Sequence, residues 1–167
     1  MAVHEHREQG KRHARCVVVT VSDTRTPATD TSGAKIRELL VEAGHEVADV
    51  MIVPDEPARI RELLEGHLAD PSVQAIFLNG GTGLAPRDTT FEAVRGLLDK
   101  EITGFGELFR VLSFEEIGAA AMLSRATAGI AAGTLVVSMP GSTAAVDLAM
   151  RRLLVPELGH ILYLLDG

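Results

Sequence analysis

The sequence predicts an α/β protein built around one mostly parallel sheet. Apolar runs typical of buried strands alternate along the chain with segments whose apolar residues recur at helical spacing. The order strand, helix, strand, helix, strand in the first half indicates right-handed crossovers between parallel strands. Aromatic residues make up only 4% of the chain and tryptophan is absent, so the core must consist of Val, Leu, Ile and Ala, as in layered α/β proteins.

The first half of the chain supplies three expected strands and two expected helices. Residues 16–21 form the first strand, and cap chemistry at residues 30–33 begins a helix that ends at Gly44. The elements expected after it are a strand over 45–53, a helix over 57–68 and a strand over 73–78.

The second half is expected to contain a helix over 91–98, a mainly helical segment over 102–128, a late strand pair at 129–130 and 134–139, and a final helix from about Thr143. The segment 102–128 carries apolar residues in too many directions for one amphipathic face. It is therefore either buried or packed in part against another subunit, and we favour the subunit contact. Its charged residues, Arg125 among them, are expected to form a solvated face or an interfacial ion pair.

Charge and cysteine content exclude several classes of protein. Sixteen basic against 23 acidic residues give a formal charge of −7, and the dispersed basic residues argue against a nucleic-acid partner. The single cysteine, Cys16, allows no disulfide within the chain. With no apolar leader and no run long enough to span a membrane, we expect no membrane partner and a cytoplasmic protein. Residues 1–14 are expected to be a flexible tail and residues 15–167 a single domain.

A glycine-rich loop after the third strand is the strongest candidate for a binding site. It consists of Gly80, Gly81, Thr82 and Gly83. Glycine has no Cβ and tolerates positive φ, so this backbone can approach a ligand closely. The polar cluster at 87–90 brings helix N–H donors to the same place, which suits an anion such as phosphate. The alternative is a turn that only reverses the chain, because the loop matches neither the Walker nor the dinucleotide fingerprint.

Two further turns are expected at the same edge of the sheet. Residues 22–25 follow the first strand and residues 140–143 follow the late strand. If these strands are parallel neighbours, the three turns line one pocket. Asp23 and Asp30 flank the segment 24–29 and either order it or bind polar ligand edges. Ser142 either donates to an anion or caps the last helix, and both roles are compatible.

Two acidic residues stand out by their placement. Asp55 comes just after the second strand, and Asp88 comes just after the glycine loop. Paired carboxylates near a phosphate commonly hold Mg²⁺. The alternative is a helix cap in each case, Asp55 for the helix over 57–68 and Asp88 for the helix that starts near Thr89. Spacing alone does not decide between these roles.

Seven motifs in order resemble the MoaB/MogA family of molybdenum cofactor biosynthesis proteins, whose domain recurs in gephyrin and plant homologues. They span nearly everything after the first 14 residues and lie at 20–23, 30–33, 80–83 with 87–88, 104–110, 113–118, 124–126 and 139–142. The sequence of residues 104–118 resembles that of the MoaB branch of the family. By the same resemblance, Asp55 matches the aspartate that MogA-type enzymes place after the second strand, and Asp88 matches the second catalytic aspartate.

This resemblance implies a three-layer α/β/α fold, assembly into trimers or hexamers, and Mg²⁺-dependent adenylylation of molybdopterin by ATP with release of pyrophosphate. Asp55 and Asp88 would be catalytic and would hold the metal, and the glycine loop would face the nucleotide phosphates. The resemblance also implies that the remaining binding residues would be Ser22, Asp23, Asp30, Ser32, Gly33, Arg87, Pro140, Gly141 and Ser142.

The MoaB-like sequence of residues 104–118 leaves a second interpretation open. The chain could be a catalytically silent carrier or scaffold that binds molybdopterin in the same pathway. The presence of both Asp55 and Asp88 favours the enzyme. The expected partners are molybdopterin, ATP, further copies of the chain and other enzymes of the pathway.

Overall fold

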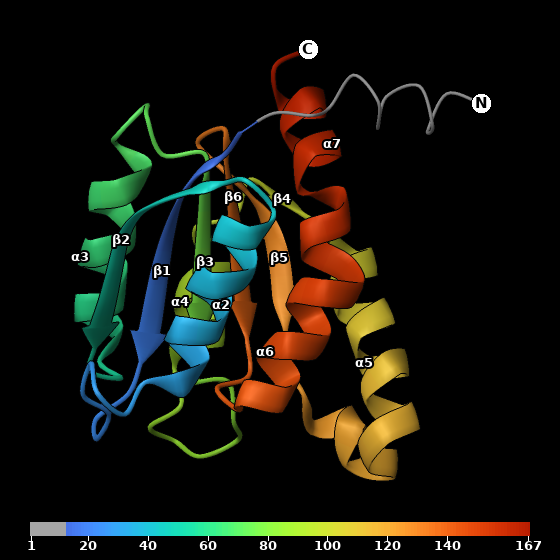
Figure 1. Ribbon diagram of the computed structural model, residues 1–167. Coiled ribbons are helices and arrows are strands. Elements are labelled where there is room, and N and C mark those ends of the chain that lie inside the picture. Colours follow the sequence, from blue (N-terminus) through green and yellow to red (C-terminus); the bar gives the residue numbers. More distant parts are fainter. Residues whose placement is uncertain (1–12) are drawn as a thin grey trace.

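The structure, a computed structural model, describes residues 13–167 and places helices on both faces of a six-stranded sheet (Figure 1). The strand order is β2-β1-β3-β6-β5-β4. The first four strands in that order are parallel, whereas β5 runs antiparallel to both of its neighbours. The predicted, mostly parallel sheet is therefore confirmed. The strands are β1 (Arg15–Val21), β2 (Glu46–Val53), β3 (Ala75–Asn79), β4 (Lys100–Glu101), β5 (Thr127–Ala131) and β6 (Thr134–Met139).

The helices divide into two layers. Side chains from α2, α5, α6 and α7 share one hydrophobic core with the sheet, and side chains from α3 and α4 share the other. This confirms the three-layer α/β/α fold (Figure 1). The helical elements are α2 (Thr31–Glu42), α3 (Pro57–Leu68), α4 (Thr90–Arg95), α5 (Thr103–Ile117), the 3-10 helix η1 (Gly118–Leu123), α6 (Thr143–Ala149), the π-helix η2 (Met150–Leu154) and α7 (Val155–Leu165).

The central strands β1, β3 and β6 are mostly apolar because both of their faces are covered. Alternate residues of a strand point to opposite faces, so Val18 and Phe77 enter the core under α2 while Val17 and Ile76 enter the core under α3. All four side chains are at most 1% exposed. The edge strand β2 is much less buried than the central strands, because only Val53 of its eight residues is buried.

The prediction of a helical segment over 102–128 is wrong at its C-terminal end. Helix α5 stops at Ile117, where Gly118 takes a positive φ of 67°, and the chain continues through η1 into β5. Small residues such as Ala126 and Ala128 fit a helix locally, but antiparallel pairing with β6 decides the conformation of residues 127–131. The helix expected over 91–98 ends early at Arg95, and the short β4 has no counterpart in the sequence prediction.

The predicted tail over 1–14 lies outside the described residues except for its last two. Ala14 is buried, and its backbone N–H donates to Nδ1 of His45 at 3.1 Å. The ring of His13 hydrogen-bonds the carbonyl oxygen of Gly44. Within residues 13–167, no helix is long and apolar enough to cross a membrane.

Leu40 tests the buried face of α2. Its side chain is fully buried, so Leu40→Ala should lower the free energy of unfolding by about 2–5 kcal/mol through lost apolar contact and a residual cavity. Leu164 is 57% exposed, and Leu164→Ala should change the same quantity by less than about 0.5 kcal/mol. Urea denaturation measures both. Equal effects would contradict the packing of α2 against the sheet.

Candidate active site

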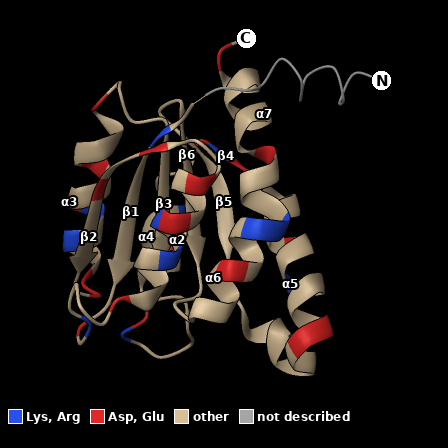
Figure 2. Cartoon of the chain, viewed as in Figure 1, with Lys and Arg blue, Asp and Glu red and all other residues tan. Residues whose placement is uncertain are grey.

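The predicted site residues gather at the carboxyl edge of the parallel strands, the lower edge in Figure 1. The chain runs from β1 to β2 on one side and later returns as β3 on the other side of β1. Open α/β sheets bind ligands at such a reversal of strand order, which here lies at the carboxyl ends of β1 and β3. Figure 2 shows acidic and basic residues next to one another in the loops along this edge.

Two glycines let the turns after β1, β3 and β6 pack backbone against backbone. Gly80 has a φ of +95°, and a Cβ on it would stand 2.3 Å from the carbonyl oxygen of Val21. A Cβ on Gly141 would stand 3.1 Å from Cα of Gly80. The N–H of Gly80 donates to the carbonyl oxygen of Met139 at 3.0 Å. The three turns therefore lie together, as the sequence predicts, and only glycine permits this approach.

Asp30 organises the start of α2. Its Oδ1 accepts from the N–H of Gly33 at 2.9 Å, which caps the helix, and its Oδ2 accepts from the hydroxyl of Thr20 at 2.7 Å. Arg25 pairs with the same carboxylate at 3.6 Å. Asn79 Nδ2 in turn donates to Thr20 at 2.9 Å. Because this carboxylate is 6% exposed and engaged on both oxygens, it orders the loop after β1 and ties that loop to the end of β3.

The carbonyl group of Gly141 helps to hold the turn after β6 to the start of α2. Ser32 donates its hydroxyl to the carbonyl oxygen of Gly141 at 2.6 Å, and Arg25 donates to the same oxygen at 2.9 Å. Ser142 accepts from the N–H of Ala145 at 3.2 Å and so caps α6. The helix-cap role expected of Ser142 is present. The half-buried Pro140 joins β6 to this turn.

Asp55 does not cap the helix that follows it. The N-cap of α3 is Glu56, with no side-chain cap bond, whereas Asp55 Oδ1 accepts from the N–H and the hydroxyl of Thr89 at 3.3 and 2.9 Å. A Cβ on Gly81 would stand 2.7 Å from the other oxygen, Oδ2. Asp55 is only 8% exposed. Its carboxylate therefore bridges the end of β2, the start of α4 and the glycine loop.

Asp88 borders the same loop further along. Its Oδ2 accepts from the N–H of Ala85 at 3.2 Å, and a Cβ on Gly83 would stand 2.7 Å from that oxygen. The N-cap of α4 is Thr89, and no side-chain cap bond is made there. The structure therefore brings both predicted aspartates to the glycine loop, Asp55 at Gly81 and Asp88 at Gly83. Neither supplies the helix cap that was its alternative role.

Asp23 connects the turn after β1 to both aspartate-bearing segments. Its Oδ1 accepts from the N–H of Asp55 at 3.1 Å, and its Oδ2 forms an ion pair with Arg87. The Arg87 hydrogen bond is the main reason why the pKa of Asp23 lies below its ordinary value. Ser22 Oγ accepts from the N–H of Arg25 at 3.0 Å and shapes this turn from within.

Arg125 contributes more to the site than the sequence prediction expected. The structure puts it after η1, and its guanidinium donates to three backbone carbonyl oxygens of the loop region. The Ser-Arg-Ala motif at 124–126 could have indicated this role. Because the motif was assigned to a helix, its arginine was expected to be solvated or part of an interfacial ion pair.

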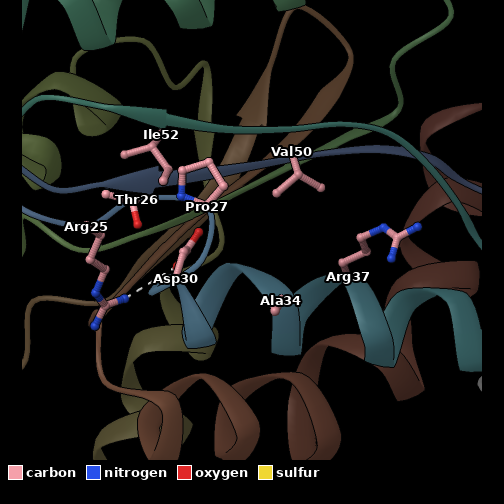
Figure 3. Close-up of a pocket in the computed structure, with 8 residues that line it drawn as sticks. All are labelled: Arg25, Thr26, Pro27, Asp30, Ala34, Arg37, Val50 and Ile52. Carbon is pink, nitrogen blue, oxygen red and sulfur yellow. Dashed lines mark ion pairs between the residues drawn. The ribbon is translucent and has the colours of Figure 1, made fainter.

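A pocket of about 620 Å³ adjoins this edge beside α2 (Figure 3). In Figure 3, Arg25 and Asp30 lie at one end of the pocket, and Arg37 lies at the other. Apolar side chains, Val50 and Ile52, come from β2. The volume lies within the range of small-molecule sites, and the lining combines apolar surface with a few charged groups, as such sites do.

Comparison with known proteins identifies the family. Residues 17–160 match the family described as "probable molybdopterin binding domain". The chain belongs to this family. It is 55% identical over 163 residues to molybdenum cofactor biosynthesis protein B of Halalkalibacterium halodurans, covering 97% of this chain and 96% of that protein. The resemblance stated from the motifs is therefore confirmed.

Solved structures with this molybdopterin-binding fold agree with the comparison. A crystal structure of molybdenum cofactor biosynthesis protein B is 51% identical, with a TM-score of 0.90, and covers 93% of this chain and 98% of that one. The tungsten cofactor synthesizing protein MoaB from Pyrococcus furiosus is 36% identical, with a TM-score of 0.81. That match covers 93% of this chain and 99% of the Pyrococcus chain.

Removal of Arg87 should raise the pKa of Asp23 in this member of the molybdopterin-binding family. The folded-state pKa is lowered, so the ion pair stabilises the fold above the ordinary value of about 3.9 and loses its effect as the pH falls through the folded value. In Arg87→Ala, carboxyl NMR titration should find the pKa of Asp23 higher than in the unmodified protein, because the hydrogen bond that lowers it most is lost. Arg151→Ala, which removes an exposed ion pair with Asp147, is the control. Equal pKa values in all three proteins would contradict the assignment.

Proposed function

We propose that this chain is a molybdopterin adenylyltransferase, which transfers the adenylyl group of ATP to molybdopterin. One observation carries the proposal: Asp55 and Asp88 both border the glycine loop, at Gly81 and Gly83. Two carboxylates beside a loop rich in free N–H donors are the groups that a phosphate-transfer site requires. Support comes from the relatives, whose names assign them to molybdenum cofactor biosynthesis.

The proposed reaction is an in-line substitution at phosphorus. An oxygen of the terminal phosphate of molybdopterin attacks the α-phosphorus of ATP. A new P–O bond forms as the bond from the α-phosphorus to the bridging oxygen breaks, and pyrophosphate leaves with that electron pair. The chain forms no covalent intermediate and contributes position and charge neutralisation. With a formal charge of −7 on the chain, that neutralisation must be local.

The glycine loop supplies neutral donors for the phosphates. The backbone N–H groups of Thr82, Gly83 and Leu84 donate to no other described residue. Donors of this kind bind phosphate oxygens without adding a mobile charge. We propose that the loop holds the nucleotide phosphates and that the β6 turn and α2 start hold the pterin side, with its ring in the pocket of Figure 3.

We propose that the two carboxylates hold Mg²⁺ as a partly hydrated ion. Within residues 13–167, no three His, Cys, Asp or Glu side chains converge as a complete metal cage. Mg²⁺ usually takes one or two carboxylates and completes its shell with water and substrate phosphates, so a pair suffices. Asp55 keeps Oδ2 free of the Thr89 contacts, and we propose that it holds the ion together with Asp88. The bound ion would offset phosphate charge.

A pyrophosphate-release assay with molybdopterin, ATP and Mg²⁺ tests the function. The proposal requires pyrophosphate to appear in a one-to-one ratio with adenylylated pterin. If release does not exceed that of a heat-denatured control while molybdopterin still binds, the chain is a carrier and the proposed reaction is wrong.

Replacing either aspartate with asparagine should lower the turnover number by roughly 100-fold or more. The amide keeps the size of the side chain but loses the charge that the transition state needs. The variants are Asp55→Asn and Asp88→Asn. Asp49→Asn, at an exposed position on the edge strand β2, is the matched control and should leave turnover unchanged. The same assay measures all three. Near-normal rates in both site variants would limit these aspartates to a structural role.

We further propose that α5 and η1 form a contact in a homotrimer or homohexamer. Six large apolar residues there are at least half exposed, and an apolar patch of this density marks an interface. They are Leu108, Val111, Phe114, Ile117, Met122 and Leu123.

A charge placed in this patch should reduce the mass of the assembly. Light scattering after size exclusion should give three or six times 17.8 kDa for the unmodified chain and a smaller assembly for Phe114→Asp. Val41 is similarly exposed but lies on α2, so Val41→Asp should keep the mass of the unmodified protein. A mass of 17.8 kDa for the unmodified chain would refute the proposed assembly.

A further inference from the structure

Arg125 joins the C-terminal end of the glycine loop to Asp88. Its Nε donates to the carbonyl oxygen of Thr82 at 3.0 Å. Its Nη2 donates to the carbonyl oxygens of Gly83 at 2.5 Å and of Asp88 at 3.2 Å. One planar guanidinium therefore spans the segment from its glycines to the aspartate that borders it. A guanidinium can do this because its donors have a fixed fork geometry.

The opposite side of the guanidinium is fixed to α4. Nη1 forms an ion pair with Glu92, and the group lies over the ring of Phe91, with its Cζ 5.0 Å from the ring centroid. Although partial desolvation opposes the change, the hydrogen bond and charge of Arg125 lower the pKa of Glu92. Only 22% of the Arg125 side chain is exposed. The guanidinium is thus held in place, and the loop is held by it.

The carbonyl contacts also determine where the loop's N–H groups point. In a planar trans peptide, the C=O and the following N–H point in opposite directions. Carbonyls turned toward Arg125 at 82, 83 and 88 therefore turn the N–H groups of Gly83, Leu84 and Thr89 away from it. Thr89 shows the result, because its N–H donates to Asp55 Oδ1 at 3.3 Å.

We propose that Arg125 is a positioning residue for the nucleotide phosphates, which rests on the proposed function. By gathering three carbonyl oxygens on one side of the loop, it presents the N–H groups of Gly83 and Leu84 to an anion on the other. Within the described part of the chain, these two groups donate to no residue. The same contact with the Asp88 carbonyl fixes the backbone from which the Asp88 carboxylate extends.

The role belongs to the shape of the guanidinium and not to its charge alone. A lysine at 125 would keep the charge, but a single ammonium on a flexible stem lacks the planar fork that spans the three carbonyls. Arg125→Lys and Arg125→Ala should therefore have the same defect, a loop that no longer holds the nucleotide phosphates. The molybdopterin side is held by separate contacts, Ser32 and Arg25 to Gly141, and should be spared.

The experiment compares Arg125→Ala and Arg125→Lys with the unmodified protein and with Arg151→Ala, which loses an exposed guanidinium elsewhere. Calorimetry measures the Kd for Mg·ATP and for molybdopterin, and hydrogen exchange measures amide protection over residues 82–89. Both Arg125 variants should weaken Mg·ATP binding by at least about tenfold, keep molybdopterin affinity within about twofold, and exchange faster over the loop. Arg151→Ala should match the unmodified protein.

Two results would overturn the inference: full recovery of Mg·ATP affinity and loop protection in Arg125→Lys, or loop exchange in both variants equal to that of Arg151→Ala. The proposed function fails separately. If the unmodified protein binds Mg·ATP but releases no pyrophosphate, the adenylyl transfer is wrong, while faster loop exchange and weaker nucleotide binding in the Arg125 variants still support the positioning role.

Discussion

The site depends on close backbone contact at the carboxyl ends of β1, β3 and β6, where Gly80 and Gly141 carry no side chain. A Cβ at Gly80 would come within 2.3 Å of the Val21 carbonyl oxygen, and one at Gly141 within 3.1 Å of Gly80. Because these glycines allow the turns after β1, β3 and β6 to touch, polar groups on separate strands come within hydrogen-bonding distance. The Asp30 network and the Ser32 contact to Gly141 follow from that approach.

The glycine loop and the segment that follows it are then held by side chains from distant parts of the chain. Asp55 binds Thr89, which follows the loop, and Arg125 binds the carbonyl oxygens of Thr82 within the loop and of Asp88 after it. Within residues 13–167, Asn79 Oδ1 and Thr90 Oγ1 are buried without a hydrogen-bond partner, and both residues flank this loop.

Much of this arrangement follows from local sequence, and the rest depends on long-range contacts. Apolar runs and cap residues predict β1, α2, β2, α3 and β3, and glycine after β3 predicts the loop, because these signals are local. The partner of Asp55 could not be predicted, since Thr89 lies 34 residues away and a cap for α3 fits equally well. The start of β5 was predicted as helix because pairing with β6 overrides a helical pattern, and Arg125, in the same predicted helix, was therefore ranked below the loop residues.

The central claim is that the glycine loop, with Asp55 and Asp88 at its border, receives the nucleotide phosphates. A crystal structure with Mg²⁺ and a non-hydrolysable ATP analogue tests it most directly. The account predicts phosphate oxygens within hydrogen-bonding distance of the Gly83 and Leu84 N–H groups, with the metal between them and at least one of the two carboxylates. Phosphates bound elsewhere, with these amides and both carboxylates untouched, would contradict it.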